Sequence, residues 1–174
     1  MKVLSIIIFL LSTHLSSTMG RVINAESENI KVYVFLHESC IISQFYTLTL
    51  KELHDKYSRE GIVFEGVFPN PKTKNEDLES FKEKHDLSFN MIIDSDQLLT
   101  KKLGATITPE VIVYNIDKDE IIYRGRIDDS YFRVGKRKRV STTSELKDVL
   151  EAINNDEPVN VEFKDAIGCF ISKI

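Results

Sequence analysis

Strand-like apolar segments alternate with helical amphipathic segments along residues 30–153, and this alternation limits the fold more than any other feature. Residues 30–36 and 62–68 are rich in Val, Ile and Phe and carry one charge each, which is typical of strands buried on both faces. Between them, apolar side chains recur every three or four residues as far as Tyr57, which predicts a helix. The alternation predicts a single α/β domain with a central mixed sheet and helices on both faces.

The same patterns predict the other elements of the domain. We expect helices at residues 74–85, 96–103 and 143–153, strands at 89–93, 110–114 and 121–126, a loop at 127–142 and a short β-like segment at 159–163. Ser39 and Asn75 are the expected N-caps of the first two helices. Gly104 is expected to end the short third helix.

The first twenty residues have the pattern of a secretory signal peptide. Lys2 precedes an apolar run from Val3 to Leu11, and small or polar residues lead to Gly20. The apolar run is shorter than the about 20 residues that span a bilayer, although a buried strand or an uncleaved anchor is an alternative. We therefore expect an exported chain, periplasmic or secreted, with no membrane span after leader removal. Residues 30–153 then form the folded domain, and 154–174 form a C-terminal tail.

Charge and composition argue against several classes of partner. The formal net charge is −4, from 23 Lys and Arg against 27 Asp and Glu, which disfavours general nucleic-acid binding. The cationic run Gly135–Arg139 is either a solvated loop or a site for an anionic ligand or partner. No CxxC or HxxxH spacing occurs, so we expect no dedicated zinc site and no bound cofactor.

Cys40 is the residue with the clearest chemical potential. It follows the first apolar strand and opens the first helix, where free N–H groups and the helix dipole stabilise a thiolate. A thiolate attacks disulfides and peroxides, so Cys40 is a candidate nucleophile, and we expect it to be alkylated faster than Cys169. The alternative is an inert thiol within the core.

Residues 30–153 resemble the thioredoxin-like superfamily, in particular the redoxin branch with alkyl hydroperoxide reductase-type (thiol-specific antioxidant-like) and membrane-tethered thiol-reductase-type proteins. The resemblance is carried by Val32–Cys40, Gly66–Asn70, Leu103–Glu110 and Tyr123–Asp129. It implies a thioredoxin-like fold in which Cys40 is the nucleophile. It also implies a cis bond between Thr108 and Pro109, with Pro109 facing Cys40 and presenting backbone to a bound disulfide substrate.

Two departures from the family pattern affect the expected activity. The thioredoxin motif has a second cysteine where this chain has Ser43, so Cys40 needs a distant thiol, glutathione or a partner to resolve a mixed disulfide. Peroxiredoxins carry Thr or Ser at the position of His37 and an Arg that polarises the peroxide, and no Arg neighbours Pro109. His37 either tunes Cys40, binds metal as in copper-delivery relatives, or simply packs.

Cys169, in the tail, is the candidate resolving thiol, and its alternative is a small buried apolar residue. The leading hypothesis is an exported thiol–disulfide oxidoreductase of redoxin type, acting through Cys40, Cys169 and Pro109. Its partners would be protein thiols or disulfides and an external thiol reductant. The alternative is a non-enzymatic thioredoxin-like binding or adaptor module with a structural Cys40–Cys169 disulfide, and a thiol peroxidase is the least favoured.

Overall fold

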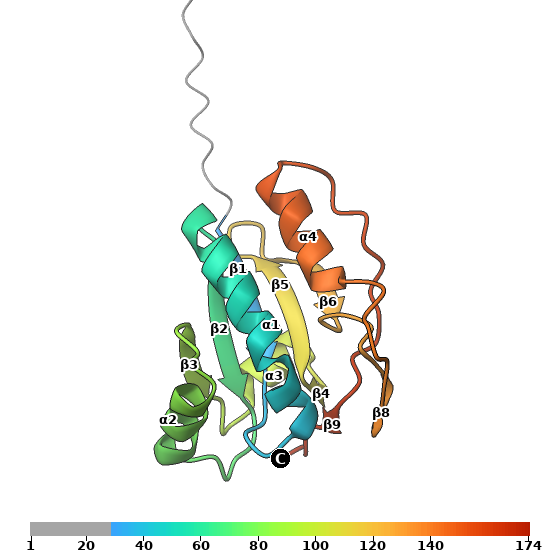
Figure 1. Ribbon diagram of the computed structural model, residues 1–174. Helices are drawn as coiled ribbons and strands as arrows, with labels where there is room; N and C mark the ends of the chain where they lie inside the picture. Colours follow the sequence, from blue (N-terminus) through green and yellow to red (C-terminus); the bar gives the residue numbers. More distant parts are fainter. Residues whose placement is uncertain (1–28) are drawn as a thin grey trace, which may run out of the picture.

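A five-stranded sheet forms the centre of the computed structural model, which describes residues 29–174 (Figure 1). Its strands are β1 (Ile30–Phe35), β2 (Val63–Phe68), β3 (Asn90–Ile93), β5 (Glu110–Asn115) and β6 (Glu120–Gly125), in the order β3-β2-β1-β5-β6. The first three strands are parallel, whereas β5 runs antiparallel to both β1 and β6. The mixed sheet expected from the sequence is confirmed. The expected signal peptide lies outside the described residues.

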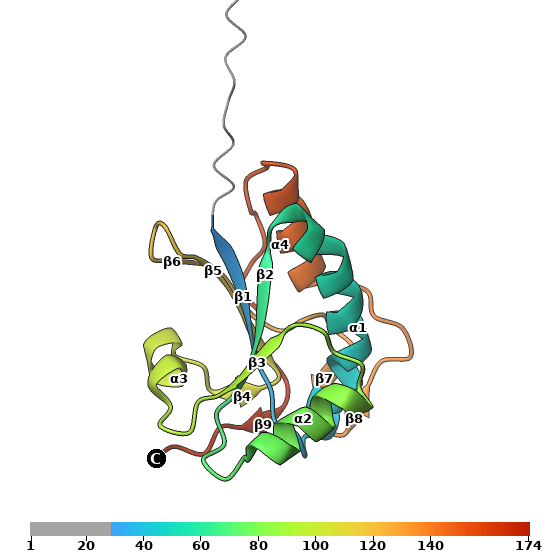
Figure 2. The same ribbon diagram turned by 90° about the vertical axis from the view of Figure 1, so that its left-hand side faces the viewer.

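Helices cover both faces of this sheet, as the sequence predicted (Figure 2). The helices are α1 (Ile41–Tyr57), α2 (Asn75–Lys84), α3 (Leu98–Leu103) and α4 (Glu145–Asn154), with a 3-10 turn η1 (Ser58–Glu60) after α1. In Figure 2, α1 and α4 lie on one side of the sheet and α3 lies on the other. Among the helices of residues 29–174, none combines the length and apolar character that crossing a bilayer requires.

Two apolar cores result from the alternation of side chains along the strands. The larger core joins Val32 and Val34 of β1 to Leu50 of α1 and Leu146 of α4. The smaller core lies on the other face, where Leu103 of α3 meets side chains of the central strands. All six residues of β5 are buried, in keeping with its place between β1 and β6. The two cores fix the sheet, and with it the loops at its edges.

The N-caps of α1 and α2 each differ from the sequence prediction by one residue, and α3 and α4 each begin two residues later than expected. Cys40, not Ser39, is the N-cap of α1, and its carbonyl accepts the N–H of Gln44 at 2.9 Å. Lys74, not Asn75, is the N-cap of α2. Asp77 Oδ2 accepts the Lys74 N–H at 2.9 Å, so a carboxylate within the helix satisfies the backbone where we had expected a capping amide.

Short strands account for the other differences. Residues 127–142, expected to be a loop, contain a small hairpin of β7 (Tyr131–Arg133) and β8 (Lys136–Arg137). The β-like segment expected at 159–163 is wrong, because these residues run outside any strand while Val159 and Val161 pack against the larger core. The tail instead forms a strand later, where β9 (Cys169–Phe170) pairs with β4 (Ile107–Thr108).

Leu50 and Leu48 of α1 give a test of the larger core. Leu50 is fully buried, whereas Leu48 is 64% exposed. We expect Leu50→Ala to lower the free energy of unfolding by about 2–5 kcal/mol, because it leaves a cavity between α1 and the sheet. Leu48→Ala is the matched control and should change it by about 0.5 kcal/mol or less. Urea unfolding curves measure both, and equal effects would contradict this packing.

Candidate redox site

The fold places Cys40 at the start of α1, after the short loop that follows central strand β1. Its side chain is only 3% exposed, because the loop before Pro109 and the tail cover it. The Cys40 thiol lies 3.4 Å from the carbonyl oxygen of Thr108 and can donate a hydrogen bond to it. The expected position of Cys40 beside the Thr108–Pro109 loop is therefore confirmed.

The peptide bond between Thr108 and Pro109 is cis, as predicted. It joins β4 to β5, so the loop that faces Cys40 is held by the most buried strand of the sheet. Thr108 itself is 1% exposed. This loop presents its backbone on two sides: the Thr108 carbonyl faces Cys40, and the β4 backbone pairs with the tail.

The tail brings Cys169 to Cys40 across 129 residues of sequence. Strand β9 is antiparallel to β4, with Cys169 opposite Thr108, and the two strands lie side by side near the start of α1 in Figure 1. Thr108 Oγ1 donates to the Cys169 carbonyl at 3.3 Å, and the Ile171 N–H donates to the Thr106 carbonyl at 2.9 Å. The two sulfurs are 2.8 Å apart and both cysteines are free thiols. The predicted proximity of Cys169 to Cys40 is confirmed.

Gly168 permits this close pairing. A Cβ atom at Gly168 would lie 2.0 Å from the Thr108 carbonyl oxygen, a distance that no side chain tolerates. A second close approach occurs upstream, where the Arg126 N–H donates to the Lys164 carbonyl at 3.0 Å. There a Cβ on Gly125, which has φ +147°, would lie 2.0 Å from the same carbonyl oxygen. Two glycines therefore allow the tail to lie directly on the domain.

Gln97 is a buried residue that joins the tail to the domain by hydrogen bonds, and the sequence did not predict this role. Its side chain is 2% exposed, and Nε2 donates to the carbonyls of Pro69 at 3.0 Å and Ser172 at 2.6 Å. The residue adopts a left-handed backbone, with φ 53° and ψ 35°, just before α3. No sequence signal identified it, because a polar residue at a helix start is ordinarily solvated.

Hydrogen bonds around Cys40 lower the pKa of its thiol. Burial raises the pKa of the Cys40 thiol, but hydrogen bonds from the Cys169 thiol and from Ser43 outweigh burial and leave that pKa below its usual value. Burial and the neighbouring Cys40 raise the pKa of Cys169 to about 11. Within the pair, Cys40 is therefore the more acidic thiol and Cys169 the less acidic one.

Ser43 contributes to this environment from the position where a thioredoxin has its second cysteine. Its side chain is fully buried, and its Oγ accepts the N–H of His37 at 3.3 Å. The hydroxyl and backbone of Ser43 also lower the pKa of Cys40 through hydrogen bonds. Ser43 thus stabilises the thiolate where a second cysteine would resolve a mixed disulfide.

His37 is held within the loop between β1 and α1. Its Nδ1 accepts the Ser39 N–H at 3.1 Å, and its Nε2 lies 3.3 Å from the amide nitrogen of Asn70. Within residues 29–174, no group of three or more His, Cys, Asp or Glu side chains is arranged to hold a metal ion. The contacts of His37 therefore order the loop that leads into Cys40.

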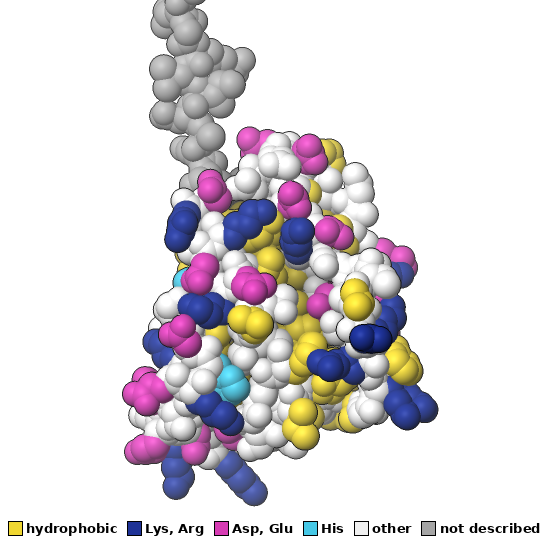
Figure 3. Space-filling model, viewed as in Figure 1, with side chains coloured by type: hydrophobic (Ala, Val, Ile, Leu, Met, Phe, Trp, Pro, Cys, Tyr) yellow, Lys and Arg dark blue, Asp and Glu magenta, His cyan; other side chains and the backbone are white. Residues whose placement is uncertain are grey.

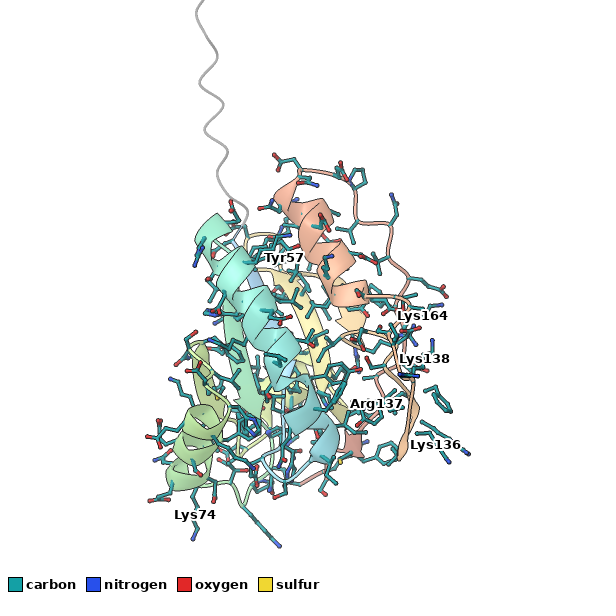
Figure 4. All side chains as sticks on the ribbon, in the orientation of Figure 1. Tyr57, Lys74, Lys136, Arg137, Lys138 and Lys164 are labelled. Atoms are coloured by element: carbon teal, nitrogen blue, oxygen red, sulfur yellow. The ribbon has the colours of Figure 1, made fainter. Side chains whose placement is uncertain are left out.

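The cationic run forms part of the β7–β8 hairpin. Figure 3 shows dark-blue and yellow side chains together at this edge of the domain. Lys138 forms an ion pair with Asp129, and the Arg137 guanidinium lies 4.8 Å from the ring centroid of Phe45. Figure 4 shows Lys136 pointing away from the domain. Two of the cations thus help to hold the hairpin against the domain, and Lys136 is solvated.

Comparisons with known proteins show similarity at the level of structure. No protein-family model matches the sequence, and no curated protein matches it. An uncharacterized conserved protein from Geobacillus kaustophilus matches with a TM-score of 0.73 at 24% identity, covering 84% of this chain and 78% of that chain. A hypothetical protein from Sinorhizobium meliloti matches with a TM-score of 0.71 at 18% identity, covering 83% and 80%.

A more distant match is a secreted disulfide oxidoreductase from Mycobacterium tuberculosis, with a TM-score of 0.47 at 17% identity, covering 54% of this chain and 66% of that chain. The class of protein follows from the chain's own architecture. A mixed sheet of order β3-β2-β1-β5-β6, a cis-proline before β5 and a cysteine at the start of α1 define a thioredoxin-like fold. The resemblance seen in the sequence is confirmed for the fold.

Replacing Cys169 tests the electrostatic account of the site. We expect Cys169→Ala to raise the pKa of Cys40 in the reduced protein, because it removes a hydrogen bond that favours the thiolate. Cys169→Ser keeps a donor at this place and should raise that pKa less. Alkylation of Cys40 as a function of pH, followed by mass spectrometry, measures both variants. An unchanged pKa in Cys169→Ala would contradict the role of Cys169.

Proposed function

We propose that this chain is an exported thiol–disulfide oxidoreductase of the redoxin type, with Cys40 and Cys169 as its redox pair. The observation that carries the proposal is the 2.8 Å separation of two free sulfurs beside the cis Thr108–Pro109 loop. In this proposal, residues 30–153 form the redox domain and residues 154–174 supply the second cysteine. Residues 1–20 direct export and are removed.

Cys40 performs the first step of the proposed reaction. Its thiolate attacks one sulfur of a substrate protein disulfide, forms a mixed disulfide and expels the other substrate sulfur as a thiolate. Hydrogen bonds from Ser43 favour the attacking thiolate, and the lowered pKa of Cys40 agrees with this role. Pro109 holds the facing loop, whose backbone meets the substrate strand once β9 has moved aside.

Cys169 performs the second step. Its sulfur, as a thiolate, attacks Cys40 Sγ, releases the remaining substrate thiolate and forms the Cys40–Cys169 disulfide. The proton of Cys169 passes to one released substrate sulfur and the other released thiolate takes a proton from solvent, so the substrate gains two electrons and two protons in all. An external thiol then reduces the disulfide. The pKa of about 11 for Cys169 favours the protonated form of this thiol until Cys40 has reacted with substrate.

The two alternative functions, an adaptor module and a thiol peroxidase, would not catalyse the reduction of substrate disulfides. A binding or adaptor module would keep Cys40 and Cys169 as a permanent structural disulfide and would not reduce substrates. A thiol peroxidase would consume peroxide at Cys40. Arg124 forms a 2.8 Å ion pair with Glu110 and also donates to the Gly104 carbonyl, so its guanidinium is already engaged within the domain. The redox pair therefore supports disulfide exchange better than peroxide reduction.

Reduction of insulin disulfides in the presence of dithiothreitol tests the proposal. We expect residues 21–174 to accelerate precipitation of the insulin B chain, and Cys40→Ala to give only the uncatalysed rate. Cys169→Ala should accumulate a mixed disulfide between Cys40 and insulin, visible as a mass adduct. Leu48→Ala, an exposed change on the same helix, is the matched control and should keep full activity.

Two other outcomes would contradict the proposal. A wild-type protein that leaves insulin intact while its Cys40–Cys169 disulfide persists in dithiothreitol would support the adaptor module. Consumption of hydrogen peroxide that depends on Cys40, without insulin reduction, would support the peroxidase.

A further inference from the structure

The two cysteines of the pair are unequally exposed. Cys40 is 3% exposed and lies beneath the tail, whereas Cys169 is exposed on the outer strand β9. The Cys40 sulfur faces the Thr108 carbonyl at 3.4 Å and the Cys169 sulfur at 2.8 Å. A thiol that approaches from solvent therefore meets Cys169 first.

We propose that Cys169 is the sulfur that an external thiol reductant attacks when Cys40 and Cys169 are joined as a disulfide. The inference rests on the proposed function and assigns the two half-reactions to different cysteines. Substrate disulfides react at Cys40 after β9 has moved, and reductant thiols react at Cys169 with β9 in place.

The direction of attack supports this assignment. Thiol–disulfide exchange proceeds nearly in line, with the incoming sulfur opposite the departing one. Because Cys40 is the inner sulfur, an in-line attack on Cys169 comes from the solvent side. With β9 in place, an in-line attack on Cys40 by an external thiol would have to come from the domain side, where the buried Ser43 and Thr108 lie, so Cys40 becomes accessible only after β9 has moved.

The identity of the leaving thiolate also supports attack of the reductant at Cys169. The incoming thiolate forms a bond to Cys169 Sγ, the Cys40–Cys169 bond breaks, and its electron pair leaves on Cys40. A second thiolate then attacks the incoming sulfur and releases Cys169 as a thiolate, which takes a proton from solvent. Exchange is faster when the departing thiol has the lower pKa, and the hydroxyl and backbone of Ser43 are placed to bind the charge on Cys40.

Strand β9 determines which of the two cysteines an external thiol reaches first. The Cys169 carbonyl accepts a hydrogen bond from Thr108 Oγ1, and the Ile171 N–H just after β9 donates to the Thr106 carbonyl. Together with the Gln97 contact to Ser172, these bonds hold Cys169 over Cys40. Gly168 allows the strand to sit at this depth. A change that lifts β9 should therefore expose Cys40 to external thiols.

Mapping the first glutathione adduct tests the inference. Wild-type protein is oxidised, its loss of two hydrogens is verified by mass, and it is mixed with reduced glutathione. Acid quenching at successive early times, alkylation with N-ethylmaleimide and digestion then locate both groups. We expect glutathione on Cys169 and N-ethylmaleimide on Cys40 at the earliest times, with any glutathione on Cys40 appearing only later by transfer.

A second variant provides the structural control. In Gly168→Ala the added methyl group would meet the Thr108 carbonyl, so we expect a larger early share of glutathione on Cys40 than in the wild type. Early adducts in the wild type that fall equally on both cysteines, or mainly on Cys40, would overturn the inference and leave the proposed function standing. Failure of the wild type to form the internal disulfide would overturn both.

Discussion

The pairing of β9 with β4 is the interaction on which the candidate site depends. It places Cys169 opposite Thr108 and brings a thiol from the end of the chain to a thiol at the start of the first helix. Because Ser43 occupies the place of a local second cysteine, Cys40 has no other thiol partner within the chain. A disulfide here would close a loop of 129 residues, which in the chain-entropy model stabilises a fold by roughly 4–5 kcal/mol before any strain.

The surroundings of the pair shift the pKa values of the two thiols in opposite directions. Burial alone would raise the pKa of both, but Cys40 also receives hydrogen bonds from Ser43 and from Cys169 itself. The inner sulfur is therefore the better nucleophile and leaving group, while the outer sulfur is the more accessible. A single arrangement of two cysteines can in this way present different reactive atoms to a disulfide and to a thiol.

The sequence predicted those parts of the structure that have a periodic or local signal. The alternation of apolar strands with amphipathic helices predicted the mixed sheet with helices on both faces, and the family resemblance predicted the cis bond before Pro109. The position of Cys40 at a helix start followed from the strand before it. The pairing of β4 with β9 could not be predicted, since two-residue strands are too short to show a period and their contact spans 61 residues.

The supporting residues were missed for a related reason. Gln97 acts through a left-handed backbone and two carbonyl partners distant in sequence, and only the folded chain brings these together. From the sequence, Ser43 indicated only the loss of a second cysteine. In the structure its buried hydroxyl lowers the pKa of Cys40 and so favours the thiolate. The proposed redox chemistry depends on the short distance between the sulfurs of Cys40 and Cys169. Titration of the wild type through a series of glutathione redox buffers, followed by intact mass, tests it most directly. We expect a single transition in which both thiols are lost together as two hydrogens, with no disulfide-linked dimer. Two thiols that persist in the most oxidising buffer, or that form glutathione adducts independently, would contradict it.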